Sequence, residues 1–200
     1  MSHKHFHGLS LALGLISLLV FVGGSCGSTP TTPPAESTKS ESSLLPGFSL
    51  YENKDFNFSM QYPSDWRKEE AGGEIKVQFF SPVENEEDTF SENLNVVIST
   101  LPKQMSFEQF VTINLDQIKQ GLLNFKSIET KDETLPAGKA RSLIFTGIYG
   151  KETAPTLKWR QTFIVSGSKI YVISYTASPD GYDKQLDTAV KMVNSLREIK

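Results

Sequence analysis

Between residues 56 and 196 the spacing of apolar residues switches between two periods, and this switching constrains the fold more than any other feature of the chain. A strand with one buried face alternates apolar and polar residues, whereas an amphipathic helix repeats its apolar residues every three or four positions. Period-two segments occur at residues 56–62, 75–79, 94–98, 127–134, 139–149, 157–165 and 169–176. Helical spacing lies between the third and fourth of these segments and returns after the last one.

Local signals place the starts of the two helices. Ser106 and Gln109 have the spacing of a capping box, and apolar residues at helical spacing follow from Phe107 to Leu122. Ser178-Pro179 predicts the start of the second helix, with serine as the N-cap and proline at the first helical position. Its apolar face would consist of Leu186, Ala189, Val190, Val193 and Leu196.

Short turns predict how the strands pair. Pro136-Ala137-Gly138 and Ser166-Gly167-Ser168 are short enough to join consecutive strands as antiparallel hairpins. The element order β-β-β-α-β-β-β-β-α therefore predicts an α+β fold, an antiparallel sheet of six or seven strands flanked by helices. Residues 48–200 have the length of one ordinary domain, so we expect them to fold alone as a monomer.

The N-terminus has the pattern of an export signal. Lys4 lies in a polar N-terminal segment, and residues 8–22 form an apolar run. The small residues 23–25 then directly precede Cys26, as at the cleavage site of an export signal. The run has 15 residues, which is shorter than the roughly 20 that a membrane-spanning helix needs. We interpret residues 1–25 as a lipoprotein-type signal peptide and Cys26 as the site of lipid attachment, which would anchor the mature chain to a membrane.

Two alternatives for the N-terminus stay open. Cleavage after Gly24 or Ser25 would release a soluble protein, and an uncleaved segment would act as a short N-terminal anchor. All three interpretations place the folded part outside the cytoplasm, at the cell surface, in the periplasm or in a thylakoid lumen. Residues 26–47 are rich in Ser, Thr and Pro, which predicts a disordered tether between the membrane and the domain.

The composition argues against several classes of function. Cys26 is the single cysteine, and no histidine follows His7, so the mature chain lacks the usual residues of nucleophilic catalysis and of zinc sites. It has no glycine-rich phosphate loop either. Removal of residues 1–25 leaves 19 basic and 23 acidic residues, a mildly acidic balance that argues against nucleic acid as a partner. We therefore expect a protein that is not an enzyme and has no required cofactor.

One acidic segment is a candidate metal site. Five carboxylates lie between the second and third expected strands, namely Glu84, Glu86, Glu87, Asp88 and Glu92. Calcium takes six to eight oxygen ligands, and closely spaced carboxylates on a loop could supply several of them. The alternative is a solvated acidic loop, because runs of charge usually face water and the spacing D-x-D-x-D-G is missing.

A second candidate is a contact surface for a protein partner. Lys158, Trp159 and Arg160 place two cations around an aromatic residue within an expected strand. Such a group is suited to binding a partner, but the alternation of a half-buried strand explains the same three residues equally well.

The order of several short motifs resembles the PsbP-like family. Residues 58–66, with Tyr62-Pro63 at the end of a strand and Trp66 nearby, look like the opening motif of these domains. Residues 77–80 and 93–98 resemble the next two strands, residues 166–171 the late hairpin and residues 190–195 the closing helix.

The resemblance covers about residues 48–200 and implies an α-β-α sandwich. It also implies a non-catalytic extrinsic protein bound to a membrane complex, which in photosynthetic organisms is the oxygen-evolving photosystem II. The lipoprotein-like start is similar to that of cyanobacterial relatives, and the lack of histidine after His7 means that no histidine-based metal site is carried over. The alternative function is a cell-surface lipoprotein that binds a small ligand or a glycan.

Overall fold

The computed structural model describes residues 44–86, 88 and 90–199. Its main element is an antiparallel sheet of seven strands. In spatial order these are β3 (Arg67–Glu69), β4 (Ile75–Phe80), β5 (Asn93–Thr100), β9 (Lys169–Ala177), β8 (Thr156–Ser166), β7 (Gly138–Tyr149) and β6 (Leu122–Leu135). A second sheet consists of β1 (Phe48–Asn53), β2 (Phe58–Pro63) and β10 (Arg197–Glu198).

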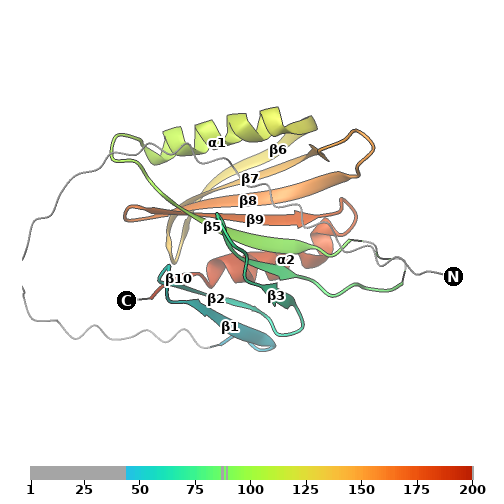
Figure 1. The fold of residues 1–200 in the computed structure, drawn as a ribbon, viewed down its shortest axis with the longest axis horizontal. Coiled ribbons are helices and arrows are strands. Elements are labelled where there is room, and N and C mark those ends of the chain that lie inside the picture. Colours follow the sequence, from blue (N-terminus) through green and yellow to red (C-terminus); the bar gives the residue numbers. More distant parts are fainter. Residues whose placement is uncertain (1–43, 87, 89, 200) are drawn as a thin grey trace, which may run out of the picture.

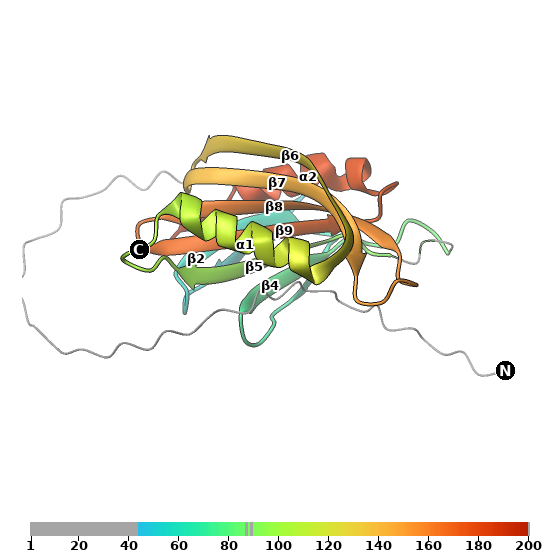
Figure 2. The ribbon, with the colours of Figure 1, turned by 90° about the horizontal axis from the view of Figure 1, so that it is seen from above.

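The helices lie on opposite faces of the large sheet, so the α+β sandwich expected from the sequence is confirmed. Helix α1 (Phe107–Gly121) covers one face, and helix α2 (Tyr182–Asn194) lies on the other together with the small sheet (Figures 1 and 2). We call these sides of the large sheet the α1 face and the α2 face.

Helix α1 begins at the predicted capping box. The Ser106 hydroxyl accepts a hydrogen bond from the Gln109 backbone N–H at 3.1 Å, and the Gln109 side chain accepts one from the Ser106 N–H at 2.8 Å. The helix ends at Gly121, and β6 follows without a loop. Leu122, which the spacing assigned to the helix, is therefore the first residue of a strand, although its side chain is buried beside the helix as expected.

Helix α2 begins later than the sequence suggested. Gly181 occupies the N-cap position, whereas the expected cap was Ser178. The Ser178 hydroxyl accepts a hydrogen bond from the Gly181 N–H at 3.0 Å. That bond closes a turn ahead of the helix, so Ser178 fixes the approach of the chain to the helix and does not cap the helix itself.

The first expected strand belongs to a different sheet from the others. Residues 58–63 form β2, which pairs with β1 on one side and with β10 on the other, outside the seven-stranded sheet. Strands β1, β3 and β10 were not expected. Short strands with mostly exposed side chains, such as β3, have no apolar alternation that a sequence pattern could reveal.

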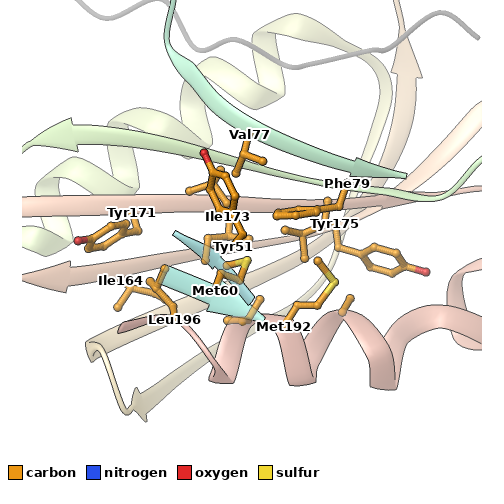
Figure 3. Close-up of a cluster of buried hydrophobic side chains, with 14 of the residues drawn as sticks. Tyr51, Met60, Val77, Phe79, Ile164, Tyr171, Ile173, Tyr175, Met192 and Leu196 are labelled. Atoms are coloured by element: carbon orange, nitrogen blue, oxygen red, sulfur yellow. The ribbon is translucent and has the colours of Figure 1, made fainter. Parts of the chain in front are cut away.

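Two apolar clusters hold the layers together. The cluster on the α1 face includes Phe107, Val111 and Ile118 of the helix and Phe145, Trp159 and Phe163 of the sheet. The cluster on the α2 face packs Tyr51 and Met60 of the small sheet between Val77, Phe79, Ile173 and Tyr175 of the large sheet and Met192 and Leu196 at the C-terminal end (Figure 3). Burial of both faces makes the large sheet the centre of the domain.

Candidate contact surface beside helix α2

Strand β8 sends the three residues of the expected contact patch to opposite faces. Trp159 is 2% exposed and stacks on Phe145 in the α1-face cluster, with ring centroids 5.4 Å apart. Its neighbours Lys158 and Arg160 point to the α2 face, because successive strand residues alternate. The Trp159 ring is therefore part of the core, and the surface of β8 at this place consists of the two cations.

Arg160 is the centre of a half-buried polar network. Its Nη2 donates hydrogen bonds to Glu133 Oε1 at 3.0 Å and to Ser142 Oγ at 3.2 Å. Ser142 Oγ in turn donates to the same Glu133 oxygen at 2.5 Å. The Arg160 and Glu133 side chains are 17% and 16% exposed, so both charges are largely desolvated. Each charge is therefore stabilised in the folded protein by the other.

Lys158 connects the sheet to the first turn of α2. Its Nζ lies 3.8 Å from the centre of the Tyr182 ring, which is a cation–π contact. The same Nζ lies 3.8 Å from Asp183 Oδ1. The Lys158 side chain remains 22% exposed, so it forms the solvent-facing edge of the group.

Tyr182 lies beneath Lys158 with 1% of its surface exposed. Burial is the largest cause that raises the pKa of its phenol, to about 12. The positive charge of Arg160 lowers this pKa, while the carboxylates of Asp183 and Glu129 raise it, so all three charges act on the phenol. Tyr182 therefore keeps its proton throughout the physiological range.

The start of α2 is held against the sheet by a second tyrosine. Tyr175 Oη donates a hydrogen bond to the Tyr182 carbonyl oxygen at 2.9 Å, and the two rings lie 5.3 Å apart. Burial raises the pKa of Tyr175, so this donor is also permanently protonated. The first turn of α2 is thereby fixed relative to Lys158 and Arg160.

The strand register brings further charges beside these residues. Lys126 of β6 pairs with Thr146 of β7, which pairs with Lys158. Glu129 pairs with Ile144, which in turn pairs with Arg160. On the α2 face, Lys126 and Lys158 thus lie in one row across β6, β7 and β8, and Glu129 and Arg160 lie in the next row. This mixture of charges is suited to recognising a protein surface.

The described carboxylates of the acidic segment lie in different surroundings. Glu84 forms an ion pair with Lys184 of α2, at 2.6 Å, and this contact raises the pKa of Lys184. Asp88 uses its two oxygens to accept from the backbone N–H groups of Glu84 and Phe90, at 2.9 and 3.1 Å. Glu86 is exposed, and Glu87 lies outside the described residues.

Glu92 is separated from these residues by its burial. It is 5% exposed, and its Oε2 accepts a hydrogen bond from Ser81 Oγ at 3.2 Å. Its Oε1 lies so close to Gly181 that a Cβ atom there would be 2.1 Å away. Glu92 therefore faces the start of α2, where a negative charge is favoured by the helix dipole. Within the described ranges no group of three or more His, Cys, Asp or Glu residues could hold a metal ion.

The remaining predictions for the N-terminus lie outside the described residues. These are the signal peptide at 1–25, lipid attachment at Cys26 and most of the tether at 26–47. In the part of the chain that the structure describes, neither helix has the length and apolar character needed to cross a membrane.

The sequence did not point to Tyr182, Glu133 or Ser142 as members of the contact surface. Glu133 precedes Arg160 by 27 positions in the chain, and their contact depends on the pairing of three strands. Tyr182 reads as an ordinary aromatic residue near a helix start. An alternating strand with charged residues on its inward face is a usable signal, because such charges require partners on the neighbouring elements.

The sequence matches the profile of one known protein family. The sequence profile of the family described as PsbP-like protein matches residues 13–196. No curated protein sequence matches the chain.

Several solved structures share the fold. Cyanobacterial PsbP (CyanoP) from Synechocystis sp. PCC 6803 is 14% identical, with a TM-score of 0.57, and the match covers 81% of this chain and 97% of that one. LpqN of Mycobacterium tuberculosis, involved in cell envelope biogenesis, is 16% identical, with a TM-score of 0.54 and coverage of 78% and 87%. The Ran-binding protein Mog1p of Saccharomyces cerevisiae is 14% identical, with a TM-score of 0.52 and coverage of 76% and 96%. At these identities the likeness concerns the fold alone.

Proposed function

Because the chain belongs to the family of PsbP-like proteins, we propose that it is a non-catalytic, membrane-tethered protein that binds or helps to assemble a membrane protein complex. In a photosynthetic source this complex would be photosystem II. The observation that carries the proposal is the extent of the family match, which begins at residue 13 and so includes Cys26 and the tether as well as the domain.

The arrangement of the chain fits this proposal. Residues 1–25 act as the signal peptide, Cys26 carries the lipid, and residues 26–47 space the domain from the membrane. The folded domain begins with β1 at Phe48, directly after that stretch. The protein stays outside the cytoplasm and meets its partner through an exposed surface, for which Lys158 and Arg160 on the α2 face are the candidates.

Replacement of Cys26, which carries the single thiol of the chain, tests the proposed lipid attachment. The Cys26→Ser variant of the full chain is expected to lose lipid labelling and to move from the membrane fraction to the soluble fraction, while its domain melts at the same temperature. Ser28→Ala changes a neighbouring residue and serves as the control. A Cys26→Ser protein that stays in the membrane fraction would support an uncleaved anchor and contradict lipid attachment.

The contact surface is tested by reversing Lys158 alone, because reversal of Arg160 would leave the half-buried Glu133 facing another carboxylate. Lys158→Glu is expected to slow capture of the complex from detergent-solubilised membranes at low salt, with a smaller effect at high salt. Lys119→Glu on α1 is the matched control, since Lys119 is an exposed lysine with an aspartate neighbour on the other side of the sheet. Equal capture by both variants would exclude this surface. An isolated monomer that carries a bound small molecule would contradict the assembly proposal.

A further inference from the structure

Two buried polar atoms beside the start of α2 have no hydrogen-bond partner. Within the described residues three buried side-chain atoms lack one, namely Arg160 Nε, Tyr182 Oη and Thr176 Oγ1. Thr176 pairs with Trp159 in the strand register and so belongs to the α1 face. Arg160 and Tyr182 belong to the α2 face, where Tyr175 connects them: it pairs with Arg160 in the strand register, and its ring lies 5.3 Å from the Tyr182 ring. Two unsatisfied groups in one place are unusual, because nearly all buried polar groups in proteins are paired.

A second arginine of the same sheet shows which contact the Arg160 guanidinium lacks. Arg141, on the neighbouring strand β7, donates from Nε to Asp132 Oδ1 at 2.5 Å and from Nη2 to Asp132 Oδ2 at 2.9 Å. Its guanidinium is thus paired with both oxygens of one carboxylate. Arg160 gives Nη2 to Glu133 and Ser142, but its Nε–H meets no acceptor within the described residues.

The chemistry of the two groups defines what would satisfy them. An Arg Nε–H can only donate, and a protonated phenol donates readily. Two donors call for a group with two acceptor oxygens, and the positive charges of Arg160 and Lys158 favour a carboxylate over a neutral amide. Asp183 does not take this role, because its side chain is 83% exposed and lies against Lys158.

We propose that Arg160 Nε and Tyr182 Oη form a recognition site for a carboxylate, an Asp or Glu side chain of the protein partner, at the centre of the contact surface. The inference deepens the proposed function and rests on it. Lys158 lies over the Tyr182 ring at the edge of the site, so its flexible, partly exposed side chain has to move aside or pair with the incoming acid. The binding energy comes from donors that are already desolvated, which is the usual character of an interface hot spot.

Removal of the Tyr182 hydroxyl separates this role from a structural one. In Tyr182→Phe no hydrogen bond to a described residue is lost, so the urea midpoint is expected to stay the same or to rise. Capture of the complex from solubilised membranes is expected to fall about tenfold, the effect of one lost charge-assisted hydrogen bond. Tyr175→Phe is the matched control, because it removes a hydroxyl that does donate a bond and so should lower the urea midpoint.

Acetate serves as the minimal probe of the carboxylate site. In a titration with sodium acetate against sodium chloride at equal ionic strength, the Arg160 Nε–H signal in NMR spectra is expected to shift and to saturate at millimolar concentrations. The Arg141 Nε–H signal should stay in place, because Asp132 already occupies it. Tyr182→Phe should weaken the response of Arg160.

Three results would overturn the inference. They are an Arg160 signal that does not respond to acetate, an unchanged capture of the complex by Tyr182→Phe, and a clear loss of stability in that variant. Saturation at micromolar acetate would show that the ligand is a free small carboxylate and not a protein side chain. If the wild-type protein captures no complex, the proposed function fails, whereas the acetate titration still decides whether the carboxylate site exists.

Discussion

The two faces of the large sheet are covered in different ways. On the α1 face a single helix packs mainly on strands that follow it in sequence, and the buried residues of its apolar cluster all lie between positions 107 and 172. On the α2 face the cover combines the start of the domain with its end, as the packing of Tyr51 and Met60 against Met192 and Leu196 shows (Figure 3). The Gln61 N–H donates to Ser195 Oγ at 2.8 Å across 134 positions of the chain.

The two faces also differ in how their buried polar groups are paired. The α1 face has an aromatic core and outer ion pairs in which Arg141 and Lys139 each meet a carboxylate. The α2 face leaves two buried donors unpaired at the start of its helix. Of the three unpaired buried atoms in the described residues, the layer assembled from distant segments therefore holds two, while the layer built from nearby segments holds the hydroxyl of Thr176.

Truncation of one buried phenylalanine side chain in each cluster should have the largest effects on stability. Phe163 on the α1 face and Phe58 on the α2 face are both fully buried. Each Phe→Ala variant is expected to lose about 3–5 kcal/mol in the free energy of unfolding, because a large cavity replaces the ring. Both variants should keep one cooperative urea transition with the slope of the wild type, since one sheet joins the two clusters. A second transition in either variant would show that the two layers unfold separately.

A pair of glycine substitutions should compare the ends of the two helices. In Gly181→Ala the new Cβ would lie 2.1 Å from Glu92 Oε1 and 2.7 Å from Ser178 Oγ, so we expect a loss of about 1–3 kcal/mol. In Gly121→Ala the new Cβ meets nothing within 4 Å, and alanine favours the helix by about 0.5–1 kcal/mol. Urea titration of both variants checks the opposite signs. A stable Gly181→Ala protein would mean that Glu92 does not have to stay at the start of α2.

The smallest expected effect concerns the ion pairs at the rim of the α1 layer. A hydrogen bond from Arg141 is the largest cause that lowers the pKa of Asp132 below its usual 3.8. A carboxylate with a lowered pKa in the folded state stabilises the protein above its unfolded pKa, and this contribution is lost as the pH falls through the folded value. The melting temperature of the wild type should therefore exceed that of Asp132→Asn slightly at pH 7, and the difference should disappear below about pH 3.

Salt provides the control for this effect. Because Asp132 is exposed, sodium chloride at high concentration should also reduce the difference between the two proteins. A difference that is constant from pH 7 to pH 2 would show that the asparagine acts through packing and not through charge.

The sequence predicted the elements that have a strong local signal. The capping box at Ser106 gave the start of α1, and the turns at 136–138 and 166–168 gave two hairpins of the sheet. It misplaced the start of α2, because a serine that closes a preceding turn has the same pattern as a serine that caps a helix. It also put β2 in the main sheet, since alternation reveals a buried face but not the partner strand.

The sequence predicted some residues of the candidate site and missed others. Lys158 and Arg160 stood out as charges within a strand, but the burial of Trp159 follows from the side of the sheet to which it points. The contacts of Glu133 and Tyr182 with these cations depend on strand order and on the placement of α2. Long-range pairing of this kind leaves no periodic pattern in a single sequence.

The way β10 closes the small sheet has a consequence for the order of assembly during synthesis. Arg197 and Glu198 of β10 pair with Ser59 and Phe58, which leave the ribosome about 140 residues earlier. The strands and helix of the α1 layer are all present once residue 177 has emerged. Phe58 and Met60, in contrast, remain without α2 and β10 until the last residues are made, so the early part of the chain has to stay soluble with its apolar strand uncovered.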